Sequence, residues 1–357
     1  MPLARYSFLK SRPENRPAYS GNRSSDGCCL QGVSSMSGKW RVLIVLCSLV
    51  SVQFCLGQEM QTECADSKCI QVGSYNLELF GSGRKPYGGV NRGPRSNDEI
   101  DRIAACISTE LDLEIVVFQE INTASDEWTT LKQKLASHGY KFHEGTTSDR
   151  HQFVVLAWDE DDVSLVDNSV SELDVRTSFN LPGGCREDGL RKPVAGRFKA
   201  GEFDFWVIGV HLKSRTGTES CTKAIRTEQT RDLVKQVEQL ESESGESDFL
   251  IVGDCNERYD HASFKPLTEA GFISQMRFLA EGSAAGSYIK TGSLNHSDDL
   301  IDHIWLRYGR TQELVRRSAT VMSLPSAESA KKHIIEQSDH VPVWMSFRTD
   351  EDLDEED

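Results

Sequence analysis

The sequence predicts an α/β fold in which helices cover mixed β-sheets. Three observations support this class. Six short, largely apolar runs, which are typical of buried strands, each end in a polar residue. Segments with helical periodicity lie between them, and several neighbouring strands are joined by turns too short for a crossover helix. Short turns join antiparallel strands and crossover helices join parallel ones, so both orientations are expected.

The elements can be assigned from the N-terminus onward. A strand ends at Asn76, and a glycine-rich loop leads to a helix capped by Asn97. The next strand ends at Glu120 and precedes a helix over residues 126–137. Strands at 153–158 and 163–166 follow, and we expect them to be neighbours. A hairpin comes next, and its second strand is Phe203–His211. The remaining elements are a helix over 223–240 and strands at 249–254, 299–306 and 341–347.

The first 57 residues form a separate part of the chain. Residues 1–35 are polar without periodicity, and we interpret them as a disordered or non-native extension before the initiator Met36. A basic start, a short apolar run and the small residue Gly57 describe a secretory signal peptide over residues 36–57. The run Val42–Val52 is shorter than the ~20 residues of a spanning helix, and an uncleaved signal anchor is the alternative. We therefore expect a secreted or periplasmic protein.

The chain is acidic, with 40 Lys+Arg against 55 Asp+Glu and a net charge of −15. Without residues 1–57, which hold seven basic and two acidic side chains, 33 basic and 53 acidic residues remain, a net of −20. Seven acidic residues lie in the C-terminal tail, residues 349–357, which we expect to be disordered. This charge balance excludes a nucleic-acid binder that is basic over its whole surface. Contacts with phosphate groups would have to come from a local basic patch or from bound cations.

Six of the ten cysteines lie beyond the signal peptide, and export allows disulfides. Cys185 and Cys221 lie in loop-like segments that flank the hairpin, and we expect them to form a disulfide. Cys64 and Cys69 are close enough in sequence to pair, although sequence does not fix connectivity. Cys255 is interpreted as a buried free thiol rather than a nucleophile, because no activating neighbour is evident.

The candidate functional side chains lie at the strand ends. They are Asn76, Gln119-Glu120, His211, Asp254-Cys255-Asn256, Asp302 and Asp339-His340. In α/β proteins, residues at strand ends form the rim of a sheet, where sites are built. A rim of carboxylates, amides and imidazoles is suited to a hard divalent cation and a phosphate ester.

These motifs also resemble a known family. Taken in order, Tyr75-Asn76, Gln119-Glu120, His211, Gly253-Asp254-Cys255-Asn256, Asp302 and Ser338-Asp339-His340 resemble the endonuclease/exonuclease/phosphatase superfamily. Each motif alone is weak, but six in the family's order, each ending an apolar strand, are specific. The resemblance covers about residues 70–348. It implies a four-layer α/β sandwich, with two mixed β-sheets face to face and helices outside.

The resemblance implies a metal edge and a pair of residues that act on water. Asn76, Glu120 and Asp339 correspond to the metal-binding residues, for Mg²⁺ or alternatively Mn²⁺. Asp254 and Asn256 correspond to the pair that orients the attacking water and holds the phosphate oxygens.

It also implies roles for the basic side chains. His340 corresponds to the catalytic histidine, and Asp302 to the residue that fixes its tautomer. His211 would contact a phosphate oxygen or assist the leaving group, and Arg191 stands where many relatives keep a phosphate-binding arginine. Gln152 occupies the position of a glutamate that partners the equivalent of His211 in pancreatic-type deoxyribonucleases, so the sequence departs from the family pattern at that dyad.

The leading interpretation is a secreted, monomeric, Mg²⁺-dependent phosphodiesterase, a nuclease acting on DNA or RNA without stable membrane association. The run His211-Leu212-Lys213-Ser214-Arg215 resembles secreted bacterial nuclease-type members, although Glu78 stands where duplex-cutting relatives tend to carry a basic residue. One alternative is a lipid or sugar phosphoesterase of the sphingomyelinase or inositol-phosphate phosphatase type. An exposed aromatic hairpin for membrane contact would favour the lipid substrate, and none is evident. The other is an inactive binding module, which missing ligand residues would indicate.

Overall fold

A computed structural model describes residues 68–84, 87, 90–147, 151–280, 286–289, 299–324 and 326–353. The predicted extension, the predicted signal peptide, Cys64 and the last four residues of the acidic tail lie outside these ranges. The tail residue Leu353 donates its backbone N–H to Glu313 at 2.6 Å. No helix in the described ranges has the length and apolarity needed to cross a membrane.

The first sheet has six strands, and its central pair is parallel. Their order is β14 (Thr320–Val321), β15 (Val343–Arg348), β1 (Cys69–Phe80), β2 (Ile115–Ile121), β4 (Phe153–Asp159) and β3 (Tyr140–Glu144). Strands β1 and β2 are parallel, and all other neighbours are antiparallel.

The second sheet is also mixed. Its order is β12 (Phe272–Ser274), β13 (Asp302–Arg307), β11 (Phe249–Asp254), β10 (Phe203–His211), β9 (Val194–Ala200) and β5 (Ser164–Leu165), with β6 (Ser171–Glu172) also pairing with β9. Here β10 and β11 form the parallel pair. A separate two-stranded ribbon consists of β7 (Phe179–Leu181) and β8 (Cys185–Glu187).

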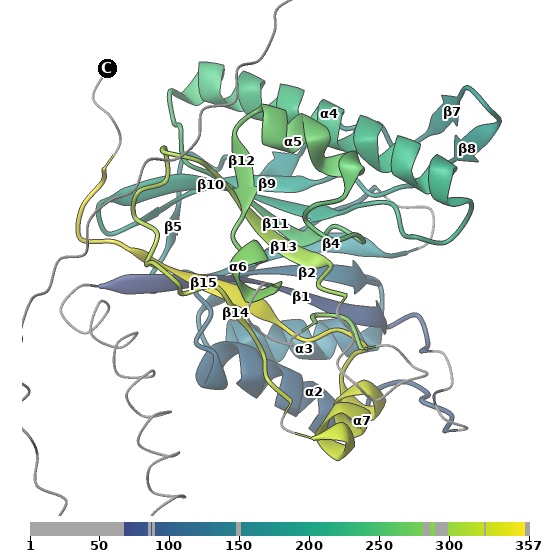
Figure 1. Cartoon of the computed structure of the whole chain (residues 1–357). Helices are drawn as coiled ribbons and strands as arrows, with labels where there is room; N and C mark the ends of the chain where they lie inside the picture. Colours follow the sequence, from purple (N-terminus) through teal and green to yellow (C-terminus); the bar gives the residue numbers. More distant parts are fainter. Residues whose placement is uncertain are drawn as a thin grey trace, which may run out of the picture. The chain divides into compact units, whose positions relative to one another are not determined.

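Helices cover the outer face of each sheet, which gives the predicted four layers (Figure 1). The first sheet is covered by α2 (Asn97–Ala105), the π-helical turn Cys106–Glu110 and α3 (Asp126–Ala136). The second is covered by α4 (Glu219–Ser244), the 3₁₀ turn Ala262–Phe264 and α5 (Lys265–Glu269). Two further helices, α6 (Arg277–Ala280) and α7 (Ala327–Glu336), lie in the C-terminal part.

The central strands β2, β10 and β11 are apolar along most of their length because both faces of each sheet are buried there. In β2, Val117 packs into the core between the sheets, whereas Val116 and Phe118 pack against the outer helices. In β10, Val207 faces the core between the sheets and Ile208 faces α4 and α5. Strands buried on two sides read as continuous apolar runs, which is the pattern that identified them in the sequence.

The two sheets approach closely at Gly209 of β10. A Cβ atom at this position would lie 2.7 Å from Val117 Cγ1 and 3.2 Å from Val154 Cγ1 of the facing sheet. The glycine therefore allows the two sheets to come into close contact. Gly209 lies two residues before His211, and Val117 lies three residues before Glu120.

Three local predictions need correction. The cap of α2 is Ser96, not Asn97, because the Ser96 hydroxyl accepts from Glu99 N and the Glu99 carboxylate accepts from Ser96 N, a complete capping box. Segments 153–158 and 163–166 are not neighbours, since the turn between them carries the chain from one sheet to the other. Helix α4 extends beyond the predicted 223–240 at both ends.

The predicted Cys185–Cys221 disulfide is present and joins β8 to the first turn of α4. Cys255 is a buried free thiol, as predicted, and Cys106 is also free. Cys69 is disulfide-bonded as well, and Cys64, which is close enough in sequence to pair with it, lies outside the described residues.

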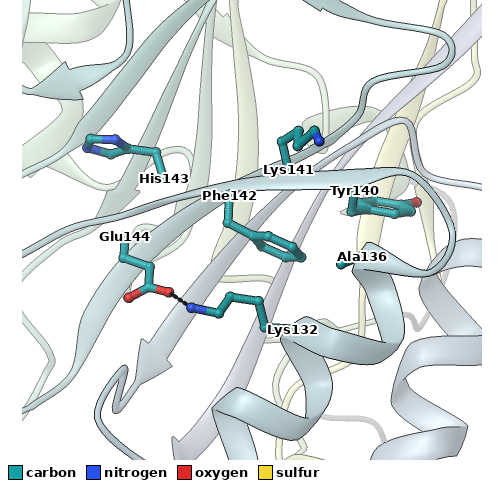
Figure 2. A pocket seen from close by; sticks show the side chains of 7 residues that line it. All are labelled: Lys132, Ala136, Tyr140, Lys141, Phe142, His143 and Glu144. Atoms are coloured by element: carbon teal, nitrogen blue, oxygen red, sulfur yellow. Dashed lines mark hydrogen bonds and ion pairs between the residues drawn. The ribbon is translucent and has the colours of Figure 1, made fainter.

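A surface hollow lies between α3 and the edge strand β3 (Figure 2). Its lining includes Lys132, Phe142 and Glu144, and Lys132 Nζ lies 2.7 Å from Glu144 Oε1. None of the predicted site residues line it. Charged side chains on an edge strand discourage pairing with other chains, which is a structural role for Glu144 of β3.

Candidate active site

The predicted site residues of both sheets lie at the same rim, where the parallel strands end. In the second sheet, strand register places His211 beside Asp254 and Asp254 beside Asp302. In the first sheet, Asn76 lies beside Gln119. Asn76 Nδ2 donates to Asp254 Oδ2 at 3.0 Å, and this hydrogen bond joins the two sheets.

Asp254 lies at the centre of the site. Its Oδ1 accepts from Asn256 N at 2.8 Å, and its Oδ2 lies 3.6 Å from His211 Nε2 and 3.9 Å from His340 Nε2. Burial, and then the neighbouring Asp302 carboxylate, raise the pKa of Asp254 to about 7, although His340 opposes the shift. A carboxyl group with a pKa near neutrality can act as a general base at physiological pH.

His340 and Asp302 form a buried hydrogen-bonded pair. His340 Nδ1 lies 2.8 Å from Asp302 Oδ2, and both side chains are almost fully buried. Burial alone would lower the pKa of His340, but the carboxylates of Asp302, Asp254 and Asp339 outweigh it and raise this pKa well above its ordinary value. The imidazole is therefore positively charged at neutral pH, with Nε2 directed toward the centre of the site.

Carboxylates accumulate beside Asp339. Burial raises the pKa of Asp339 to about 7, and the charges of Glu78 and Glu120 add to this increase. Arg92 forms a bidentate ion pair with Glu78, with both N–O distances at 2.5 Å. In the described part of the chain, no lysine or arginine lies within 4.0 Å of the Glu120 or Asp339 carboxylate.

His211 is next to Arg191. Arg191 Nε donates to His211 Nδ1 at 3.2 Å, and Arg191 Nη2 lies 2.5 Å from His211 Nε2. Burial, Arg191 and His340 all lower the pKa of His211 well below its ordinary value, so this imidazole is neutral. The closest carboxylates, Asp254 and Glu120, lie 3.6 and 3.9 Å from its Nε2, so the charged group in contact with His211 is an arginine.

The backbone is unusual where these side chains leave the strands. Glu120 and Asn256 have φ values of 63° and 56°, in the left-handed region that non-glycine residues rarely adopt. Gly253 has a φ of 148°, and a Cβ there would lie 2.0 Å from the Val210 carbonyl oxygen. Only glycine fits this position, which accounts for the glycine before Asp254.

Three buried arginines hold the segment that precedes Asp339. Arg84 Nη1 donates to Ile335 O at 2.6 Å, Arg92 Nη1 donates to Ile334 O at 3.0 Å, and Arg95 Nη2 donates to Gln337 O at 2.6 Å. These carbonyls end helix α7, so the arginines satisfy its C-terminal acceptors and complement its dipole. The sequence interpretation missed this role. The available signal was a cluster of arginines in a short loop of an acidic protein.

Two sets of side chains at the rim could hold a metal ion. Asn76, Glu120 and Asp339 are the set predicted from the sequence. The second set is Asp254, Asp302 and His340, and its ligand atoms are the ones at the rim that lie within 4.8 Å of one another. A metal in that second set would compete with the 2.8 Å His340–Asp302 hydrogen bond, so we assign the set to acid–base chemistry. Away from the rim, Asp248, Glu313 and Asp352 form another acidic group with this spacing.

The fold and the rim define a protein of the phosphoester hydrolase class. The model of the Endonuclease/Exonuclease/phosphatase family matches residues 73–340, and the chain belongs to this family. Comparison with curated protein sequences gave no match.

Solved structures confirm the fold. The catalytic domain of human Nocturnin with bound sulfate is 18% identical, with a TM-score of 0.54, over 78% of this chain and 94% of that one. D. rerio TDP2 with a single-strand DNA product is 15% identical, with a TM-score of 0.55, over 79% and 100%. A mannosyl-6-phosphatase of Bacteroides thetaiotaomicron is 18% identical, with a TM-score of 0.53, over 77% and 98%.

Proposed function

We propose that this protein is an exported, monomeric, Mg²⁺-dependent phosphodiesterase that hydrolyses DNA or RNA. One observation carries the proposal: an unbroken set of contacts runs from Asn76 through Asp254 to His340 and Asp302. This set places a base of raised pKa beside a charged imidazole in a buried site. In-line hydrolysis of a phosphate ester needs these two groups, together with neutralisation of the phosphate charge.

In this mechanism Asp254 is the base. Asn76 and the backbone N–H of Asn256 hold its two oxygens, which leaves a free lone pair for an attacking water. Asp254 takes the water proton as the new phosphorus–oxygen bond forms and the ester oxygen leaves. The departing oxygen finally takes up that proton, so Asp254 returns to its carboxylate form.

The basic side chains bind the phosphate. Charged His340 donates a hydrogen bond from Nε2 to a non-bridging oxygen, and Asp302 keeps this imidazole protonated and oriented. Arg191 supplies a second positive charge. Neutral His211 adds a hydrogen bond to a phosphate oxygen or to the leaving group.

The residues at the metal edge fit Mg²⁺. Arg92 neutralises Glu78, whereas Glu120 and Asp339 lack a lysine or arginine partner among the described residues, and Asn76 adds an amide oxygen. Two carboxylates and an amide are hard oxygen donors of the kind that Mg²⁺ prefers. When bound, Mg²⁺ would neutralise charge on the phosphate and on the leaving oxygen.

Export rests on the predicted signal peptide and is supported by the Cys185–Cys221 disulfide, since disulfides persist in oxidising compartments. N-terminal sequencing of protein recovered outside the cytoplasm should begin near Gln58. A mature chain that retains Met36 would contradict cleavage.

A turnover panel tests the activity. Purified residues 58–357 would be offered plasmid DNA, RNA, sphingomyelin and inositol phosphates with Mg²⁺, Mn²⁺ or Ca²⁺. We expect hydrolysis of nucleic acid that a chelator abolishes and that His340→Ala lowers by about 10²–10⁴-fold, while the control variant His138→Ala, at an exposed position, keeps full activity. Turnover of sphingomyelin or inositol phosphates alone would replace the nuclease proposal with the lipid or sugar alternative, and full activity in excess chelator would refute the metal.

A further inference from the structure

The short segment Ser287–Ile289 contacts both members of the His340–Asp302 pair. The backbone of residues 287–289 pairs with that of residues 339–341 in an antiparallel bridge centred on Tyr288 and His340. Ile289 N donates to Asp339 O at 2.7 Å, and Val341 N donates to Ser287 O at 2.9 Å. These two hydrogen bonds fix the backbone on either side of His340.

This pairing also places a ring against the imidazole. Tyr288 and His340 form a non-hydrogen-bonded pair, in which the two side chains stand close together on one side of the bridge. Their ring centroids are 5.1 Å apart. Ile289, on the other side, is fully buried in the core between the sheets and anchors the segment there.

Ser287 contacts the other member of the pair through the backbone. Its hydroxyl oxygen accepts from Asp302 N at 3.0 Å and from Ile301 N at 3.1 Å, and the side chain is fully buried. Asp302 Oδ2 is held by His340, whereas Asp302 Oδ1 is buried without a hydrogen-bond partner among the described residues. Because a hydrogen bond fixes only one of the two carboxylate oxygens, the position of the Asp302 side chain depends on how its backbone is held.

We propose that the Ser287 hydroxyl is a positioning residue for phosphodiester hydrolysis, setting the geometry of the His340–Asp302 pair from a segment that holds both backbones. The inference rests on the proposed function, because it assigns Ser287 to the same reaction. Ser287 reaches no reacting atom itself. It acts through Asp302, in the way that outer hydrogen-bond partners orient the groups that contact substrate.

The test compares Ser287→Ala with Ser274→Ala. Both serines are buried, and Ser274 bonds to His303, which neighbours Asp302 but contacts Ser274 and the Glu257 carbonyl instead of the site. With Mg²⁺ and the best substrate of the panel, we expect Ser287→Ala to lower kcat about 10- to 100-fold with little change in KM. Ser274→Ala should keep kcat within about twofold of wild type.

A second arm separates positioning from loss of folded protein. In a His340→Ala background, Ser287→Ala should lower the residual kcat no further, because the pair through which it acts is already broken. If Ser287→Ala lowers kcat by the same factor in both backgrounds, the inference is overturned. It is also overturned if the Ser287→Ala variant behaves like the Ser274→Ala control.

Two outcomes distinguish this inference from the proposed function. If His340→Ala is as active as wild type, the catalytic assignment is wrong and the inference falls with it. If His340→Ala retains only residual activity and Ser287→Ala is not impaired, the inference alone fails. A readout without substrate is the Nδ1–H proton resonance of His340, assigned by its loss in His340→Ala. Ser287→Ala should shift it and Ser274→Ala should not; an unshifted resonance in Ser287→Ala would count against the inference.

Discussion

The contact between the sheets at Gly209 makes catalysis sensitive to packing in the core. In Gly209→Ala, the new methyl carbon would meet Val117 Cγ1 at 2.7 Å. Carbon atoms in contact prefer roughly 3.5–4.0 Å, so the sheets must separate or rearrange by about 1 Å. Inserting a methyl group into a packed core typically costs about 1–3 kcal/mol of unfolding free energy.

The same shift should reach the active site. Gly209 and Val117 lie close in sequence to His211 and Glu120, whose Nε2 and Oε1 atoms are 3.9 Å apart across the two sheets. A displacement of about 1 Å between catalytic groups can lower the rate by roughly 10²-fold. We therefore expect Gly209→Ala to lower kcat/KM by about that factor while the protein remains folded.

Urea denaturation and steady-state kinetics would measure the two effects. Val117→Ala removes the clashing methyl groups, so the Gly209→Ala/Val117→Ala variant should recover part of the lost kcat/KM. Gly196→Ala is the matched control, because its Cβ would meet the Phe198 ring at 3.0 Å in the same sheet but away from the rim. Wild-type kinetics in Gly209→Ala, or no recovery in the double variant, would refute the reasoning.

Three further predictions concern single carboxylates and the catalytic pair. Glu120→Gln should lower the affinity for Mg²⁺ more than it lowers folding stability, because carboxylate charge sets the affinity at a hard-ion site. A Mg²⁺ titration of activity should show partial rescue of the variant at high Mg²⁺, and a Mg²⁺ affinity equal to that of wild type would contradict the prediction. His340→Ala should lower kcat by about 10²–10⁴-fold, and adding Asp302→Ala should cost little more, whereas additive losses would separate the two residues. Burial raises the pKa of Glu114 to about 7 from 4.5, so its folded form holds the proton more tightly and stability falls as pH rises between those values. Glu114→Gln should therefore gain up to about 3 kcal/mol over wild type above pH 7 but little below pH 4.5. Denaturation across this range, with exposed Glu110→Gln as control, checks the sign, and a difference independent of pH would argue against it.

The fold could be predicted from the sequence wherever burial on both faces made a strand apolar throughout. Strands Phe203–His211 and Phe249–Asp254 were predicted with the bounds observed. The short strands β6, β7 and β8 lack this signal, because partial burial leaves no apolar run. The sheet to which residues 163–166 belong depends on a turn that crosses between sheets, and periodicity does not encode that crossing.

The candidate site was predictable in its composition but not in its contacts. Asn76, Asp254 and His340 could be named because their motifs stand beside apolar runs in a recognisable order, although Asn76 lies within β1 and His340 precedes β15. Their hydrogen bonds depend on strand register and on the spacing of two sheets, which no local pattern specifies. Ser287 was missed for the same reason: its role arises from contacts with residues distant in the sequence.

The order of strands in the first sheet has a consequence for how the protein is made. The last long strand, β15, lies inside the sheet and pairs with β1, so Cys69 lies opposite Arg348. Until β15 leaves the ribosome, β1 presents an open edge of unpaired N–H and C=O groups, which is a template for aggregation. Contacts between such distant segments also form slowly, because a long loop must close first. The half of the site that carries His340 is thus assembled only after the strands that precede β15, and a nascent chain would remain inactive until β15 has been synthesised.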